Sequence, residues 1–444
     1  MRGLISILII LYSFPGISQD AKNVLLLDHW MDTNLTLGVE DARLSDVWGF
    51  DQNGGLYCAV GTTEGVSFFQ IDQGQLNLVD EMAGAFQGYT VVHRDMKTYR
   101  NYLYAVGDEG TATLQIFDLS YLPDSVSKVY DSNALFTVCH NIYIDTLNAK
   151  LYACGSNNNG MKVIDISNPE NPTLIYNYTQ VPYVHDCYVR NDTAFLNCGY
   201  DGLKIYDFSG AIPIELGLLD FYADQGYNHS GWMSPNGKLY AFCDETLGAK
   251  IKLCQLNEYS MIKVDQTFGT DDYLNYTPHN IYLTNELAFV AYYNEGLRVF
   301  DLARSPIKEV GKYDTFHQET EYTLNGAWGI YVFEKEELIL VSDRQNGLYL
   351  LSFPIALYEA SNSQISVYNT PFVDGQSILL PKDLFLEDDL TFTISDIDGK
   401  VIYKQASYVN WVNLPQTLSA GSYVYGIYDK DGKLIDSGKF VKAN

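Results

Sequence analysis

The sequence has little basic charge. Its 444 residues include 28 Lys and Arg against 55 Asp and Glu, which gives a formal net charge of −27 at pH 7. A surface with this excess of negative charge repels the phosphates of DNA and RNA, so we expect no nucleic-acid partner. The same excess keeps a protein soluble and attracts cations.

Long apolar runs are also missing beyond the start of the chain, and we expect no transmembrane segment. The first residues differ, because Arg2 precedes an uncharged run over residues 4–12, and the small residues Gly16 and Ser18 follow. These features are typical of a secretory signal peptide, which we place at residues 1–18. The alternative is a buried N-terminal strand, but the run has no alternating polar positions that would face solvent.

The common signatures of catalysis are absent from the sequence. It contains no Gly-rich phosphate loop, no Cys-X-X-Cys pair, no His-Glu-X-X-His helix and no Gly-X-Ser-X-Gly elbow. Ser230 follows His229 directly, but neighbouring residues of a strand point to opposite faces and cannot form a proton relay. These absences leave open whether the chain is an enzyme, and they assign no reaction to it.

Cysteine is present in an odd number, seven, so an oxidising compartment would leave at least one thiol unpaired. Cys58, Cys154 and Cys198 recur at or near the same place in a repeat, as small core residues do. If residues 191–193 form the turn between two strands, Cys187 and Cys198 lie opposite each other. That pair is either a disulfide or two free buried thiols.

A repeat dominates the sequence. A short apolar strand that opens on His or Trp-Gly recurs seven times, at spacings of 45, 47, 45, 44, 50 and 49 residues. The openings are Trp48-Gly49, His93, His140, His185, His229, His279 and Trp328-Gly329. This is the period of a four-stranded propeller blade. We therefore predict an all-β chain with a seven-bladed β-propeller over residues 23–353.

The two ends of the repeat predict how the ring closes. The last unit stops at Pro354 without a fourth strand, whereas residues 23–30 match the fourth strands of the other units. We expect this N-terminal strand to complete the last blade and so remove an open sheet edge. Residues 354–364 are expected to be a linker, and the short alternating strands within 365–444 predict a small C-terminal β-sandwich.

The repeated openings should meet at one mouth of the central channel, because the first strand of each propeller blade lines it. We predict a partial ring of five histidines, two tryptophans in the remaining sectors, and two aspartates beside the ring. The candidate ligand-binding residues are His93, His140, His185, His229, His279, Trp48, Trp328, Asp95 and Asp186.

Imidazoles that converge in this way have two chemical uses. They could bind a divalent transition metal or donate hydrogen bonds to an anionic or sugar ligand. The candidate metal ligands are His140, His185, His229 and His279. The alternative is structural, because each ring could instead hydrogen-bond the backbone of a neighbouring blade and set the packing of the blades.

Part of the repeat resembles a known family. Residues 163–167, Val-Ile-Asp-Ile-Ser, are followed by Asn168-Pro169 and Asn171-Pro172, and this phrase resembles the LVIVD repeat. Residues 23–353 as a whole are similar to the choice-of-anchor B family of secreted bacterial proteins. The resemblance implies a propeller but no catalytic residue, because the family carries no assigned chemistry.

The tail resembles a second family. Residues 392–402, 418–425 and 439–442 are similar to the type A C-terminal sorting domain of the type IX secretion system of Bacteroidetes. The resemblance implies that the secretion machinery is a partner of the tail, and that the body is secreted or attached to the outer-membrane surface. The function we expect is a binding scaffold for a glycan, peptide or protein. The alternative is a metal-dependent enzyme that uses the histidine ring.

Overall fold

The computed structural model describes residues 21–318, 324–359, 377–379, 390–396, 399–407, 411–413, 418–419, 421–428, 430 and 432–442. The expected signal peptide lies outside the described residues, as does the part of the expected linker after residue 359.

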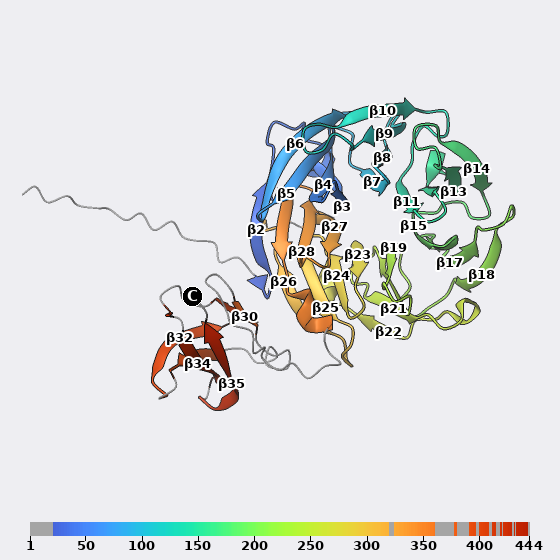
Figure 1. Ribbon diagram of the computed structural model, residues 1–444. Coiled ribbons are helices and arrows are strands. Elements are labelled where there is room, and N and C mark those ends of the chain that lie inside the picture. Colours follow the sequence, from blue (N-terminus) through green and yellow to red (C-terminus); the bar gives the residue numbers. More distant parts are fainter. Residues whose placement is uncertain are drawn as a thin grey trace, which may run out of the picture.

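Seven antiparallel sheets surround one axis as the blades of a propeller (Figure 1). Blade 1 contains β3 (Leu44–Gln52), β4 (Gly55–Thr62), β5 (Gly65–Asp72) and β6 (Gln75–Ala83). Blade 2 contains β7 (Arg94–Tyr99), β8 (Tyr102–Gly107), β9 (Leu114–Asp118) and β10 (Ser127–Ser132). Blade 3 contains β11 (Asn141–Asp145), β12 (Lys150–Cys154), β13 (Met161–Asp165) and β14 (Thr173–Tyr178). Blade 4 contains β15 (Asp186–Arg190), β16 (Thr193–Asn197), β17 (Leu203–Asp207) and β18 (Ile214–Leu219). Blade 5 contains β19 (Asn228–Met233), β20 (Leu239–Asp244), β21 (Ile251–Gln255) and β22 (Gln266–Phe268). Blade 6 contains β23 (Asn280–Leu283), β24 (Leu287–Ala291), β25 (Leu297–Asp301) and β26 (Lys308–Tyr313). Blade 7 contains β27 (Ala327–Phe333), β28 (Leu338–Asp343) and β29 (Gly347–Ser352). The predicted all-β propeller is confirmed.

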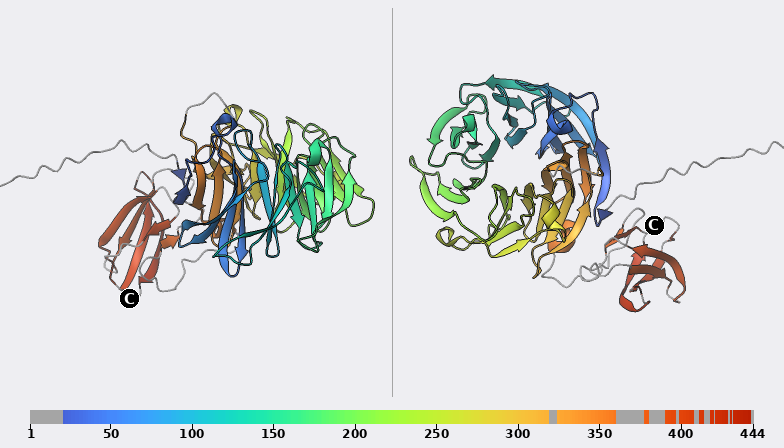
Figure 2. Two further views of the ribbon diagram at one scale, coloured as in Figure 1. Left: turned by 90° about the horizontal axis from the view of Figure 1, so that it is seen from above. Right: turned by 180° about the vertical axis from the view of Figure 1, so that it is seen from behind.

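The N-terminal strands join the last two blades. β2 (Leu25–Trp30) pairs with β29 as the outer strand of blade 7, and β1 (Ala21–Lys22) adds a fifth strand to blade 6 beside β26. Asp28 of β2 also accepts a hydrogen bond from the backbone N–H of Leu76 in blade 1, at 2.7 Å. The first and last blades are therefore tied together through a strand from the start of the chain (Figure 2).

Turn chemistry sets the register inside a blade, as blade 4 shows. Asn191 and Asp192 have φ values of +51° and +62° between the paired residues Arg190 and Thr193. Two consecutive positive φ angles are the requirement of a two-residue type I′ hairpin turn, and Asn and Asp tolerate them better than most residues. The backbone N–H of Asp192 donates to Asp145 of blade 3 at 2.7 Å, so the turn also connects neighbouring blades.

This register overturns the cross-strand cysteine pair. Cys187 faces Leu196 rather than Cys198, because the turn lies one residue earlier than the disulfide hypothesis needs. All seven cysteines are free and buried. The Cys187 thiol lies 3.3 Å from that of Cys154 in blade 3, within an apolar cluster that both blades form. The cysteines are core residues at the interfaces between blades.

The hydrophobic core is divided among these interfaces. Ile142 and Leu151 of blade 3 pack with Val106 and Ile116 of blade 2, and each further interface repeats the arrangement. Sheets that pack face to face bury one side of each strand against the next sheet, which explains the alternation of buried and half-buried residues along β11. The inner edges of the blades are left to line the axis.

The chain after blade 7 begins differently from the expected linker. Residues 355–359 form the short helix α1 (Ile355–Glu359), in which Ile355 and Tyr358 are buried and the Tyr358 ring stacks on Phe353 at 5.3 Å. The helix forms because these two apolar residues, three positions apart, share one face. In the described part of the chain, no helix is long and apolar enough to span a membrane.

The C-terminal strands form two further sheets. The larger has the order β32 (Val401–Ser407), β31 (Leu390–Ser395), β34 (Gly421–Tyr428), β35 (Leu434–Lys442). The smaller pairs β30 (Ser377–Leu379) with β33 (Trp411–Asn413). Phe392, Ile394, Tyr425 and Ile427 are buried on the larger sheet. The described part of the tail consists of strands, as the predicted β-sandwich requires, and it includes one strand, β33, that the pattern did not indicate.

Candidate functional site

Five histidines and one tryptophan form a continuous layer across the channel. Neighbouring ring centroids are 4.4 Å (His93–His140), 4.2 Å (His140–His185), 4.1 Å (His185–His229), 4.3 Å (His229–His279), 4.2 Å (His279–Trp328) and 5.7 Å (Trp328–His93) apart. The layer contains six of the seven side chains that the sequence places there. Its closed circuit leaves the channel narrow at this level.

Trp48 is the exception, and it lies with Tyr331 at a ring distance of 4.9 Å. Tyr331 is the third residue after Trp328, and Trp48 is the third after Ser45, so Ser45 takes the place of the histidine in blade 1. Ser45 contacts the backbone of Arg94 through its hydroxyl, at 3.1 and 3.3 Å. The alignment of the repeats on the Trp-Gly pair was therefore wrong by three residues in the first blade.

Two of the histidines hold neighbouring blades together. Nδ1–H of His185 donates to the backbone oxygen of His229 at 3.0 Å, and Nδ1–H of His279 donates to that of Trp328 at 2.8 Å. Each bond fixes the proton on Nδ1 and leaves Nε2 with a lone pair. These two histidines therefore hydrogen-bond the backbone of a neighbouring blade, which is the structural role that the sequence analysis gave as an alternative. Nε2 of each ring takes no part in these bonds.

Burial keeps most of the layer uncharged. Loss of hydration lowers the pKa of His93 to about 3 and that of His229 to about 4, and it also lowers the pKa of His185 and His279. His140 differs because its Nδ1 lies 2.8 Å from a carboxylate oxygen of Asp108. Burial opposes its charge, but the bond to Asp108 outweighs burial and raises the pKa of His140.

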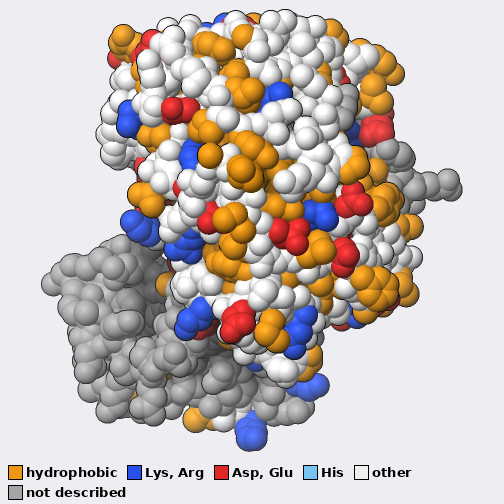
Figure 3. Space-filling model, turned by 90° about the vertical axis from the view of Figure 1, so that its right-hand side faces the viewer, with side chains coloured by type: hydrophobic (Ala, Val, Ile, Leu, Met, Phe, Trp, Pro, Cys, Tyr) orange, Lys and Arg blue, Asp and Glu red, His pale blue; other side chains and the backbone are white. Residues whose placement is uncertain are grey.

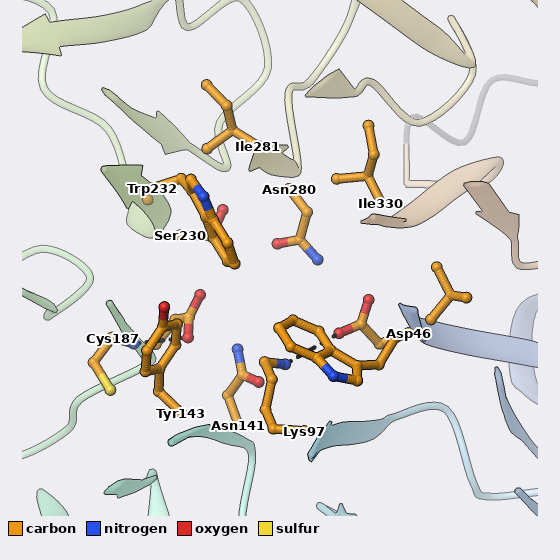
Figure 4. A pocket seen from close by; sticks show the side chains of 14 residues that line it. Asp46, Lys97, Asn141, Tyr143, Cys187, Ser230, Trp232, Asn280, Ile281 and Ile330 are labelled. Carbon is orange, nitrogen blue, oxygen red and sulfur yellow. Dashed lines mark hydrogen bonds and ion pairs between the residues drawn. The ribbon is translucent and has the colours of Figure 1, made fainter. Parts of the chain in front are cut away.

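A polar cavity lies next to the histidine layer along the axis. It has a volume of about 40 Å³, which is room for a few water molecules. Asn141 and Asn280 point into it from opposite sides, with Ser230 and Asp46 at its wall (Figure 4). Asp186 also lines this cavity, so it does not lie at the mouth where the sequence analysis placed it.

Lys97 supplies the positive charge at this level. Its ammonium donates to Asp95 at 2.5 Å and lies 3.9 Å from Asp46. Asp95 is fully buried and also accepts backbone N–H groups of Met96 and Ile142, so it holds the lysine instead of facing the mouth. Burial raises the pKa of Lys97's other neighbours: that of Asp186 to about 7, and that of Asp46 well above its ordinary value.

A second aromatic layer closes the far side of the cavity. It consists of Trp48, Tyr143, Tyr188, Trp232, Tyr282 and Tyr331, with neighbouring rings 4.8 to 6.0 Å apart. Lys97 fills the gap in this circuit, with its ammonium 4.6 Å from the Trp48 ring. The channel is thus filled by three successive levels: imidazoles, a polar centre, and aromatic rings.

The mouth above the histidines carries groups that the sequence analysis did not assign. A chain of aromatic contacts runs from exposed Tyr200 to Tyr227 at 5.2 Å and on to His185 at 5.4 Å. Glu245, which follows β20, lies 3.9 Å from His229 and 4.0 Å from His279. The signal for it was the recurring acidic pair at the end of a second strand, Asp108-Glu109 in blade 2 and Asp244-Glu245 in blade 5.

On the side of the outer rim where β14 and β18 lie, aromatic, acidic and imidazole groups are not gathered as they are at the mouth. Leu174, Ile175 and Ile214 are exposed there. Apolar side chains on this side are spread among charged and polar ones (Figure 3). The mouth is therefore the part of the propeller where aromatic, acidic and imidazole groups come together.

Comparison with known proteins gives a partial family assignment. Residues 152–180, which cover β13 and β14 of blade 3, match the model of the LVIVD repeat. No curated protein matches the sequence.

Solved structures with the same fold are numerous and distant. U3-55K has a TM-score of 0.54 at 9% identity and covers 74% of this chain and 98% of its own. A protein from Lactobacillus plantarum has a TM-score of 0.54 at 14% identity, over 71% and 93%. PorZ of the type IX secretion system of Porphyromonas gingivalis has a TM-score of 0.50 at 12% identity, over 89% of this chain and 59% of PorZ. At these identities the likeness shows the fold alone.

The buried ion pair of Lys97 and Asp95 in the polar centre should contribute to the stability of the fold. Lys97→Met should lower the free energy of unfolding by about 3–5 kcal/mol, because it leaves Asp95 buried without its cation. The control is Lys263→Met, which removes an exposed lysine paired with Asp265 at 3.3 Å and should cost less than about 1 kcal/mol. Urea unfolding of both variants measures the difference, and equal losses would show that Lys97 is not a buried charge centre.

Proposed function

We propose that the chain is an exported surface scaffold that binds a glycan at the mouth above the histidine layer. The observation that carries the proposal is the chain of rings from exposed Tyr200 through Tyr227 to His185, with carboxylates of Asp108 and Glu245 around the same mouth. Aromatic faces stack against the C–H faces of sugar rings, and carboxylates accept hydrogen bonds from sugar hydroxyls. Peptides and proteins are the competing ligand classes.

The closed channel favours binding at the mouth over passage through the axis. The histidine layer, the small polar centre and the second aromatic layer fill the channel, so a ligand larger than a few waters that enters at the histidine side has to stop above the histidines. His140 and Asp108 are partly exposed, so a ligand at the mouth can reach them.

Four observations support export to the surface. The tail resembles a type IX sorting domain, its described strands form a separate β domain, and the fold is shared with PorZ, a surface component of that secretion system in Porphyromonas gingivalis. The N-terminal segment resembles a signal peptide. The proposed route is passage through the inner membrane by the signal peptide and through the outer membrane by the tail.

Glycan binding can be tested at Tyr200, which is 78% exposed. Tyr200→Ala should weaken binding to a positive glycan on an array about two- to twelvefold, because a lost stacking contact contributes about 0.5–1.5 kcal/mol. Tyr121→Ala is the matched control, since Tyr121 is 61% exposed and follows β9 on the opposite face. Binding that is lost equally in both variants, or binding to peptides but to no glycan, would contradict the proposal.

Export can be tested by intact-mass analysis of the protein in its native host. Surface or secreted material should lack residues 1–18 and about the last 80 residues, the size of a small β-sandwich. Deletion of residues 365–444 should leave the propeller in the periplasm. Full-length protein in the cytoplasm would contradict the proposed route.

A further inference from the structure

We propose that His229, His279 and Glu245 form a zinc site at the mouth of the channel. Nε2 of His229 lies 3.9 Å from one carboxylate oxygen of Glu245, and Nε2 of His279 lies 4.0 Å from the other. One ligand atom of each residue lies within 4.8 Å of the other two. Ligands of a tetrahedral zinc ion are about 3.3 Å apart, so small side-chain movements would close the site.

The hydrogen bonds of His279 prepare it as a ligand. Its Nδ1–H donates to the backbone oxygen of Trp328 at 2.8 Å, which leaves the lone pair on Nε2. This Nε2 is buried and has no hydrogen-bond partner. An imidazole held through one nitrogen by a carbonyl, with the other nitrogen free, is the usual arrangement of a metal-bound histidine.

Nε2 of His279 and the carboxylate of Glu245 that faces it are both acceptors, and this favours a cation between them. A lone pair of neutral His279 points toward a negatively charged carboxylate, with no hydrogen between the two atoms at 4.0 Å. Two acceptors that face each other in a buried site repel unless a proton, a water or a metal ion lies between them. Metals require the neutral imidazole, and the Nδ1–H bond of His279 to Trp328 places the one proton of that ring on the side away from Glu245.

The surroundings hold the carboxylate and leave one side open. The Tyr293 hydroxyl donates to Glu245, which orients the carboxylate as outer partners of metal ligands do. Arg344, whose charge acts on His279, is paired with Glu40 at 2.8 Å and lies over Trp328. His229 and His279 are nearly inaccessible, whereas the Glu245 side chain is 21% exposed, so the fourth ligand position faces the mouth.

The donor set selects the metal. Two imidazole nitrogens and one carboxylate oxygen, with one open position, match the three-ligand pattern of zinc sites that keep a water or a ligand oxygen as the fourth group. The set differs from the four histidines predicted from the sequence. His140 is bonded to Asp108, and the three ligand atoms that lie within 4.8 Å of one another include a carboxylate oxygen of Glu245, which supplies a negative charge, instead of a nitrogen of His185.

Zinc binding is measured on the full chain, purified without an affinity tag and treated with a chelator. Titration calorimetry with Zn²⁺ should give one ion per chain, and Co²⁺ should give the visible spectrum of a four-coordinate ion. Glu245→Gln should weaken Zn²⁺ binding at least tenfold while it keeps the acceptor for Tyr293. His279→Asn should weaken it at least as much.

The matched control is Asp108→Asn, which changes another carboxylate in contact with a layer histidine and should alter Zn²⁺ affinity less than twofold. If His279→Asn does not fold, Glu245→Gln still decides, because Glu245 lies in a partly exposed loop. No Zn²⁺ binding by the folded wild type, or equal binding by Glu245→Gln, would overturn the site and point to a bridging water. The titration is independent of the glycan array, so either proposal can fail alone.

Discussion

The inward ends of seven strands share one narrow axis, and the side chains there must pack with almost no access to water. Charged groups in such a place are costly unless they are paired. Lys97 resolves this cost by its bond to Asp95, which in turn binds the backbone of Ile142 in the next blade. Neutral imidazoles on one side and aromatic rings on the other then separate the polar centre from solvent.

The same constraint places the candidate function at the mouth. A filled axis cannot conduct a ligand, so recognition is left to the loops that stand above the histidine layer, where Tyr200, Glu245 and Asp108 are found. The imidazoles contribute in two ways. His185 and His279 use Nδ1 to join blades, and this structural role is compatible with the binding role that we propose for the mouth.

The period of the repeat was enough to predict seven blades, since each unit needs a neighbour to bury its faces. The level of Trp48 along the axis was not predictable from the Trp-Gly pair, because the same pair stands at two different positions of the first strand. Trp48 corresponds to Tyr331, three residues after Trp328, and therefore lies in the second aromatic layer. Glu245 was missed because its partners come from two other segments, and α1 because Pro354 indicated only a stop.

The histidine layer is closed and buried, and it is neutral except at His140. A pH titration of the histidine ring signals by NMR, on metal-free protein, tests this most directly. His93, His185, His229 and His279 should stay uncharged down to pH 5, because burial lowers their pKa. His140 should take up its proton above pH 6.5, and Asp108→Asn should shift that uptake to lower pH. Five histidines that titrate together near pH 6.5 would mean an open, water-filled mouth and would contradict this account.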